Sequence, residues 1–498
     1  MKKRKKILGV FLAVAAAAVL LLVGVYSGRN VGQGETGDAI LAGKPTLNLW
    51  YTDESLEDFL ASAALDFSEE RNVRVIPTLV SGLEYLESIQ EASLSTNAYP
   101  DLYILGNESL EKAWLAGLAS EIRDAENSVS AEHFPETAIR AVSYQGKMIG
   151  YPFFFETSAL VYNKTYLEEM AAALLEAEAD ALAGQEAMAA LDENGEPVAG
   201  EDAATGEPES AAITEEAIAQ RVEELIPTTI DGILSFADSY NAPEQVEAVF
   251  RWDVSDIFYN YFFVGNYADV GGPYGDDENS IDIYNEETIR CLTAYQDLNQ
   301  FFSIDPDEVT YESVVQDFLD GKLVFTVATT DILNRLEEAV ADGSFPYEYG
   351  VTRTPDIDEE LGTRSLSVTN VAVVNGYSEQ KETANAFARF LTQEASAELY
   401  ESAHKLPAFT EAVPETEQAA AFAGEYAQSV PIPKMMTTSN YWVQMEIAFT
   451  QIWGGEEVSE TLRGLSEQIL SQVKGEAVTE EYIEPPLQET QTETGMEE

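Results

Sequence analysis

The chain has 498 residues, 45% of them hydrophobic, and carries a formal net charge of -62 with an isoelectric point near 4.1. This length exceeds one compact core and predicts two or three structural units. So negative a chain repels phosphate backbones, which excludes nucleic acid as a partner and disfavours anionic ligands. The single cysteine, Cys291, and two histidines offer no internal disulfide and no zinc cluster, so we expect neither a metal nor a cofactor. Cys291 itself is expected to be a small apolar residue on a helix.

Residues 1–26 are predicted to hold the chain at a membrane. Basic residues at positions 2–6 precede an apolar run from Ile7 to Tyr26, which at about 20 residues can cross a bilayer. Since positive charge stays cytoplasmic, the rest is expected at the extracellular face of a bacterial cell membrane. No Ala-x-Ala site lies between Leu20 and Lys44, which favours an uncleaved anchor over a cleaved signal peptide. Residues 27–44 are rich in Gly and polar residues, as flexible tethers are.

Alternating strands and helices begin after this tether. Short apolar strands are predicted at 47–51, 73–76 and 100–105, with helices at 56–67, 84–96 and 109–115 between and after them. This order is typical of βαβ units, and it predicts a mostly parallel sheet covered by helices.

The middle of the chain is predicted to cross between two lobes. Strands at 146–152 and 158–163 flank an aromatic turn, Phe153–Glu156. A segment rich in Ala and Glu follows at about 171–224, and we interpret it as a solvated acidic insertion with helical ends. Later strands are clearest at 324–328 and 368–374. Residues 475–498 form an acidic tail that is expected to be disordered.

Four segments together resemble a known family. They are LNLWYT at 47–52, YPDLYI at 99–104 with AGL at 116–118, YQGKMIGYP at 144–152 continuing to YNK at 162–164, and DFLDGK at 317–322. A weaker fifth is ANAFARFLTQEASA at 384–397. Their order and spacing over most of 45–474 are similar to the extracellular solute-binding proteins of ABC importers, the family that contains the maltodextrin-binding proteins.

This resemblance implies an α/β fold of two discontinuous lobes, the type II periplasmic-binding-protein architecture. Lobe one would comprise 45–154 with 367–410, and lobe two would comprise 156–364 with 411–474. A hinge would join them, and a small ligand would bind in the cleft, because parallel sheets present loops at the carboxyl ends of their strands.

Candidate ligand-binding residues follow from the chemistry of sugars, whose hydroxyls need polar partners and whose C–H faces pack on aromatic rings. Polar residues at predicted strand ends and at the crossing are Asp53, Glu54, Asn107, Glu108 and Glu156. The resemblance places aromatic platforms at Trp252, and at Trp442 with its neighbour Tyr441. It places Asp331, or its neighbours Thr329 and Thr330, where maltodextrin binders carry a Trp, which argues against a long α-glucan.

We therefore expect a monomeric binding protein, not an enzyme, that captures a neutral carbohydrate, a short oligosaccharide, and delivers it to ABC permease subunits in the membrane. An extracellular glycosidase stays open as an alternative, since a cleft rich in carboxylates could supply an acid and a nucleophile. A membrane-held sensor or adhesion protein with the same fold is the third possibility.

Overall fold

The computed structural model describes residues 45–95, 99–123, 129–189 and 213–485. Its strands are β1 (Thr46–Tyr51), β2 (Arg74–Leu79), β3 (Leu102–Gly106), β4 (Ser143–Tyr144), β5 (Lys147–Met148), β6 (Tyr151–Asn163), β7 (Ala248–Phe250), β8 (Asp269–Val270), β9 (Ile281–Asp282), β10 (Leu323–Thr329), β11 (Tyr349–Thr352), β12 (Leu366–Val374), β13 (Leu406–Pro407) and β14 (Val430–Pro431).

The α-helices are α3 (Glu57–Arg71), α4 (Tyr85–Ser95), α5 (Leu110–Leu115), α7 (Glu136–Val142), α8 (Lys164–Ala189), α9 (Glu215–Leu225), α10 (Ile230–Ser239), α11 (Ile257–Asn260), α12 (Glu286–Phe302), α13 (Tyr311–Leu319), α14 (Ile332–Asp342), α15 (Lys381–Arg389), α16 (Leu399–Ala403), α17 (Glu417–Gln428), α18 (Tyr441–Trp453) and α19 (Val458–Lys474). Side chains of Thr, Asp and Asn accept hydrogen bonds from the first turn of several of these helices. Thr310 and Ser313, for example, form a reciprocal capping box at the start of α13.

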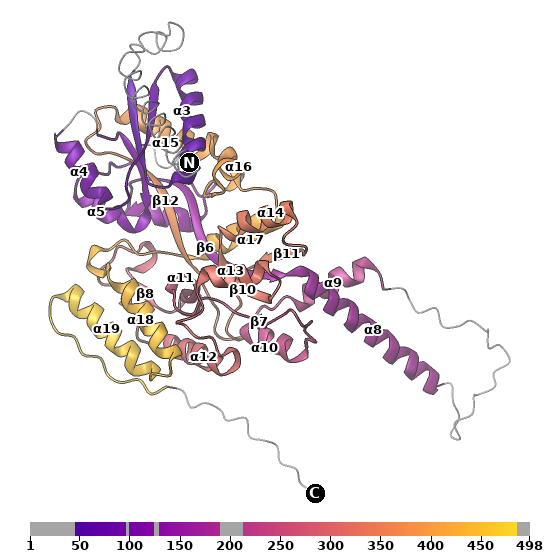
Figure 1. Cartoon of the computed structure of the whole chain (residues 1–498). Helices are drawn as coiled ribbons and strands as arrows, with labels where there is room; N and C mark the ends of the chain where they lie inside the picture. The colour runs from indigo at the N-terminus through magenta and orange to yellow at the C-terminus, as the bar shows by residue number, and fades with distance from the viewer. Residues whose placement is uncertain (1–44, 96–98, 124–128, 190–212, 486–498) are drawn as a thin grey trace, which may run out of the picture.

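Two long strands connect the lobes (Figure 1). The main sheet runs β2-β1-β3-β12-β6-β10-β7, with β1 parallel to both β2 and β3. Residues Tyr151–Thr157 of β6 pair with β12, and Ser158–Tyr162 pair with β10. One strand thus belongs to both lobes, which makes β6 and β12 the link about which the lobes can move.

The predicted aromatic turn at Phe153–Glu156 is wrong, because β6 runs without a break from Tyr151 to Asn163. Every residue of this strand except Glu156 is buried. The sequence therefore lacks the alternation of apolar and polar residues that marks a strand with one face in solvent. Continuous apolar character here reflects burial on both faces rather than a turn.

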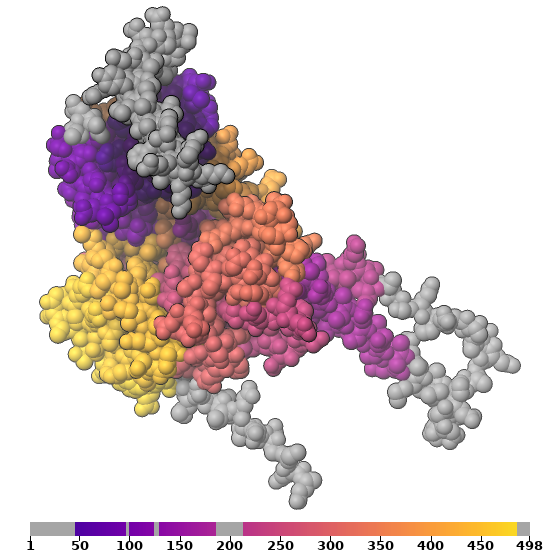
Figure 2. All heavy atoms as spheres, in the orientation of Figure 1, coloured from indigo at the N-terminus to yellow at the C-terminus, as the bar shows by residue number. Residues whose placement is uncertain are grey.

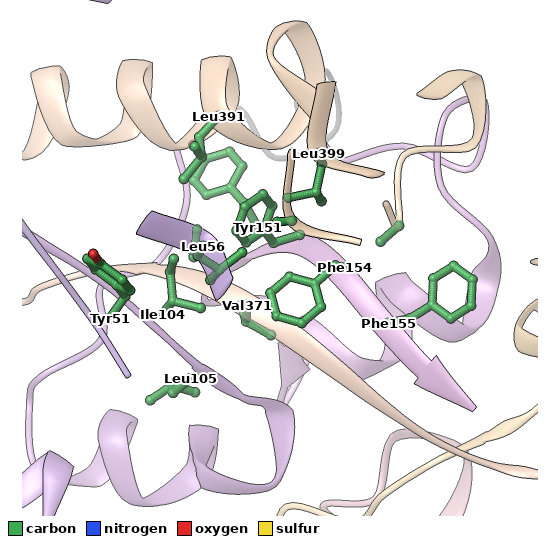
Figure 3. Packing of buried hydrophobic residues seen from close by; sticks show 14 of the residues in the cluster. Tyr51, Leu56, Ile104, Leu105, Tyr151, Phe154, Phe155, Val371, Leu391 and Leu399 are labelled. Carbon is green, nitrogen blue, oxygen red and sulfur yellow. The ribbon is translucent and has the colours of Figure 1, made fainter. Parts of the chain in front are cut away.

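Two hydrophobic cores lie on either side of the crossing. The first surrounds β1, β3, β12 and the start of β6, and it continues along β6 to α13, α14 and α17. In Figure 3, Leu391 and Leu399 point from their helices towards Tyr151 and Phe154. The second core joins α10, α12, α18 and α19 to β7 and β10. Cys291 lies on α12 inside this second core, and burial raises the pKa of its thiol to about 12, as suits a structural residue.

The Ala/Glu-rich insertion leaves the body as two paired helices, α8 and α9, that project from lobe two (Figures 1 and 2). Only their bases enter the second core, through Met170, Ala171 and Val222, whereas Leu182 farther along α8 is 61% exposed. Arg221 of α9 contacts Glu178 of α8 at 2.9 Å. The central part, residues 190–212, lies outside the described residues.

The predicted disorder of the C-terminal tail does not begin at residue 475. Beyond α19 the chain turns back over the second core, where the Ile483 N–H donates to the Tyr284 hydroxyl at 2.7 Å. The Ile483 carbonyl accepts from Ser459 at 2.6 Å. Hydrogen bonds and partial burial of Ile483 therefore hold residues 476–485, although this segment is acidic. Residues 486–498 are outside the described residues.

Candidate functional site

A cavity of about 260 Å³ lies at the crossing between the lobes. Its walls are formed by Glu156, Tyr259, Tyr311, Thr329, Thr330, Asp331, His404 and Lys405. Another depression, of about 360 Å³, lies on the outside of lobe one between α3 and the turn after α15, and its charged lining is wholly acidic. We assign the site to the smaller cavity, because its residues come from both lobes and hinge closure would enclose it.

Local structure explains why these side chains converge. Glu156 is the one residue of β6 that is not buried. Residues 329–331 lie where β10 ends and α14 begins, at the carboxyl end of a strand. His404 adopts the left-handed conformation with φ 53°, which ends α16 and leads Lys405 towards the cavity.

Two stacked tyrosines form the aromatic part of the wall. The rings of Tyr259 and Tyr311 lie 4.5 Å apart at 15°. The Tyr311 hydroxyl donates to Asp331 Oδ1 at 2.7 Å and accepts from the Thr329 backbone N–H at 3.3 Å. Its backbone N–H donates to Asp253 Oδ2 at 2.8 Å. Burial raises the pKa of both tyrosines, so at neutral pH they are uncharged phenols held in a fixed orientation.

Asp331 is held by several partners besides Tyr311. Its Oδ1 also accepts a hydrogen bond from the Thr329 hydroxyl, and its Oδ2 lies 3.4 Å from Arg335 Nε. Arg335 in turn contacts Glu312 at 2.6 Å. The Asp331 carboxylate is thereby compensated within lobe two.

Lys405 is the cation that lines the cavity. Its Nζ lies 3.0 Å from Asp53 Oδ2 and 3.9 Å from Glu156 Oε1, and it sits 5.6 Å from the centre of the Phe154 ring. Burial alone would raise the pKa of Asp53, but hydrogen bonds from Ser55 and Lys405 lower it. Lys405 therefore forms its ion pair mainly with Asp53.

Glu156 and Glu108 are less well compensated. Burial raises the pKa of Glu156, the Lys405 charge opposes this, and the charges of Asp53 and Asp331 add to it. Glu108 touches solvent, yet crowding by protein atoms raises its pKa, and the charge of Glu156 raises it further. These two carboxyls thus lie close enough to disfavour each other's ionisation.

The structure brings four of the predicted residues together, namely Asp53, Glu108, Glu156 and Asp331. Lys405 contacts both Asp53 and Glu156, Asp331 lines the same cavity as Glu156, and the charge of Glu156 acts on Glu108. Glu54 lies beside Asp53 in a short 3-10 helix, where its side chain is exposed. Glu54 does not line the cavity.

Two of the other candidates have structural roles. Asn107 is fully buried, donates to the Ile432 carbonyl at 2.8 Å and accepts from the Thr369 N–H at 2.9 Å, so it ties backbone segments together. Trp252 is 0% exposed and stacks on Phe250 at 4.6 Å. Its ring is consumed by core packing, which contradicts the expectation of a sugar platform.

The Tyr441–Trp442 pair lies at the start of α18. Tyr441 is buried in the second core, whereas Trp442 is half-buried and lies 5.5 Å from the Tyr261 ring. Neither lines the cavity. Sequence reasoning missed the aromatic pair Tyr259 and Tyr311 and the cation Lys405, which fall in segments without a motif and come together only through the tertiary fold.

Comparison with known proteins identifies the family. A model of the bacterial extracellular solute-binding proteins matches residues 63–424. The chain belongs to this family. This membership places the protein outside the cytoplasm and makes it a binder of solutes. A comparison with curated protein sequences gave no match.

Several solved structures share the fold at low sequence identity. An extracellular solute-binding protein from Staphylococcus aureus in complex with maltose has 16% identity and a TM-score of 0.66, covering 86% of this chain and 98% of its own. A cyclo/maltodextrin-binding protein complexed with maltotetraose has 19% identity and a TM-score of 0.65, covering 86% and 97%. A maltose-binding periplasmic protein from Listeria monocytogenes in complex with maltose has 17% identity and a TM-score of 0.63, covering 88% and 100%. These likenesses confirm the predicted two-lobed α/β fold.

Proposed function

We propose that this protein is the solute-capturing component of an ABC importer and that it binds a carbohydrate reversibly in the cavity around Glu156. The observation that carries the proposal is the pairing of a stacked Tyr259–Tyr311 wall with the carboxylates of Glu156 and Asp331 in a cavity that Lys405 of the other lobe also lines. Carboxylates and threonine hydroxyls accept and donate hydrogen bonds to sugar hydroxyls, and aromatic rings pack against C–H faces.

The size and lining of the cavity favour a short ligand. A volume of about 260 Å³ holds about one sugar ring, so further units of an oligosaccharide would extend towards the cleft mouth. The three structural neighbours bind maltose or maltotetraose. At the end of β10 this chain has Thr329, Thr330 and Asp331 instead of an aromatic platform, so we propose a ligand other than a long α-glucan.

Ligand capture would couple to motion of the lobes. Since Glu156 lies on the shared strand and Asp331 and Lys405 approach it from opposite lobes, a sugar bonded to all three would draw the lobes together. A closed complex would then dock on membrane permease subunits, with the binding protein acting as a monomer.

We also propose that residues 7–26 anchor the chain. They lie outside the described residues, and among the described ones no helix combines the length and apolarity needed to span a bilayer. Mass spectrometry of the protein from native membranes tests the anchor. If the segment is not cleaved, the mature chain should begin at residue 1 or 2. A mature chain that starts between Gly28 and Lys44 would show a cleaved signal instead.

A ligand panel tests the carbohydrate assignment directly. The full-length protein, purified in mild detergent, is screened by thermal shift against sugars, amino acids, polyamines and short peptides. We expect stabilisation by sugars, reduced in Tyr311→Phe and retained in Asp66→Asn, which alters a carboxylate on the outer face of lobe one. Stabilisation by peptides or polyamines alone would refute the assignment. Recovery of the sugar unchanged after incubation would exclude the glycosidase alternative.

A further inference from the structure

The site is unevenly charged. Four carboxylates, those of Asp53, Glu108, Glu156 and Asp331, act on one another within it, whereas its cations are Lys405 and, behind Asp331, Arg335. His404 also lines the cavity. Two of the carboxylates each have a cation within contact distance, because Asp53 holds Lys405 at 3.0 Å and Asp331 holds Arg335 and the Tyr311 hydroxyl.

The remaining negative charge is concentrated at Glu156 and Glu108. Glu156 reaches Lys405 only at 3.9 Å, and its side chain is 42% exposed towards the cavity that it lines. Glu108 has a hydrogen bond from the neighbouring Ser109 hydroxyl at 3.2 Å and no cation within contact distance among the described residues. Keeping a carboxylate ionised costs free energy when it is partly desolvated and has no close cation. A ligand that brings a positive charge lowers this free-energy cost.

We propose that the bound sugar carries a protonated amine and that its ammonium group pairs with Glu156. This inference rests on the proposed function and refines it, because it replaces the neutral carbohydrate expected from the sequence with an amino sugar. The negative net charge of the whole chain disfavours anionic ligands but does not distinguish neutral from cationic ones. The uncompensated carboxylates of the site favour a cationic ligand. Glu108 and Asp331 add a negative field around the ammonium position, and Lys405 remains with Asp53.

A metal ion could also supply the positive charge that pairs with Glu156, but the structure supports it less well. Among the described residues no group of three or more His, Cys, Asp or Glu side chains is arranged to hold one. An ammonium group on a sugar ring uses the rest of the lining as well, since the ring can pack on the partly exposed Tyr311 and its hydroxyls can bond to Thr329 and Thr330.

The experiment compares matched ligands by calorimetry on the full-length protein at pH 7. Glucosamine, glucose and N-acetylglucosamine share one ring and differ at C2, which carries an ammonium, a hydroxyl or a neutral amide. The β-1,4-linked disaccharide of glucosamine tests a longer amine. We expect the amines to bind at least about tenfold more tightly than the neutral sugars. In Glu156→Gln this ratio should collapse towards one, and in Asp66→Asn it should be unchanged. Because Glu156→Gln relieves repulsion, the variant should unfold at the same or a higher temperature than the wild type.

Acidification provides a second measurement. The raised pKa of Glu156 means that protonation competes with the amine, so affinity for glucosamine should fall as the pH is lowered below 7 while that for glucose changes less. Equal affinities for amines and neutral sugars would overturn the inference and leave the proposed function standing. Binding of putrescine or spermidine without any sugar would overturn both.

Discussion

The Lys434 ammonium donates a hydrogen bond to the Arg140 carbonyl at 3.0 Å, which joins the segment before α18 to helix α7. It also donates to the Tyr274 carbonyl. Lys434 is 1% exposed, and burial lowers its pKa to about 8 although the charges of Asp276 and Glu111 oppose this shift. A buried lysine thus bridges the predicted lobes on a different side from the sugar cavity.

This lysine should make stability rise with pH. Below about pH 8 both folded and unfolded states carry the proton, so its desolvation cost is present in full. Between about pH 8 and the ordinary lysine pKa of 10.5 the native state loses the proton while the unfolded chain keeps it. The free energy of unfolding therefore gains up to about 1.4 kcal/mol per pH unit in that window.

Urea unfolding of wild type and Lys434→Met at pH 7 and pH 9.5 measures this effect. The wild type should gain stability relative to Lys434→Met as the pH rises, because the variant has no proton to lose. Lys147→Met, which removes an exposed lysine, should track the wild type. Parallel behaviour of wild type and Lys434→Met across the two pH values would contradict the shifted pKa.

Gly106 at the end of β3 should control the position of Glu108. A Cβ at this residue would lie 2.1 Å from Glu108 Oε2, so Gly106→Ala must displace the carboxylate. The backbone of Gly106 has φ -71° and suits any residue, and the end of a long side chain moves easily. We expect stability within about 0.5 kcal/mol of wild type and a change in ligand affinity of about threefold or more.

A contrasting glycine provides the control for this substitution. In Gly350→Ala the added Cβ would lie 2.1 Å from the ring of Tyr162, which is buried and has no room to turn aside. That variant should lose about 1 to 3 kcal/mol of stability. Unaltered affinity in Gly106→Ala, measured by calorimetry, would show that the position of Glu108 does not matter to the ligand.

The two tryptophans singled out from the sequence should behave differently. Trp252→Phe removes the donor that bonds Asn260 Oδ1 at 2.8 Å inside the core, so we expect a loss of about 2 to 3 kcal/mol in unfolding free energy. Trp442→Ala affects a half-buried ring and should cost less. Calorimetric titration of both variants with the best sugar of the panel would detect any direct role. Full-strength binding by Trp442→Ala would exclude that residue from the site.

Sequence patterns predicted the alternation of strands and helices because buried strands and amphipathic helices differ in local periodicity. They also predicted the acids at strand ends, since a strand end can be located from the chain alone. They failed at β6, where burial on both faces erased the periodicity, and at Trp252, where an aromatic residue in a core has the same local signature as one in a cleft. Tyr259, Tyr311 and Lys405 come from three separate segments, so only tertiary packing places them together.

The acidic insertion should be dispensable for folding. Within residues 173–219 the described side chains that contact the second core are the partly buried Leu174 and Ile218. The ion pair between Glu178 and Arg221 is exposed and contributes little. Replacing Ala173–Ala219 by a short Gly/Ser linker should therefore lower the unfolding free energy by only about 1 kcal/mol.

A longer deletion distinguishes the arm from its base. Removing Leu167–Leu225 takes away Leu167, Met170, Ala171 and Val222, which are all buried in the second core. Since deleting several buried apolar side chains costs several kcal/mol, that variant should lose cooperative unfolding of lobe two. Differential scanning calorimetry compares the two deletions with the wild type. Loss of the cooperative transition already in the shorter deletion would show that the arm packs into lobe two and is part of its fold.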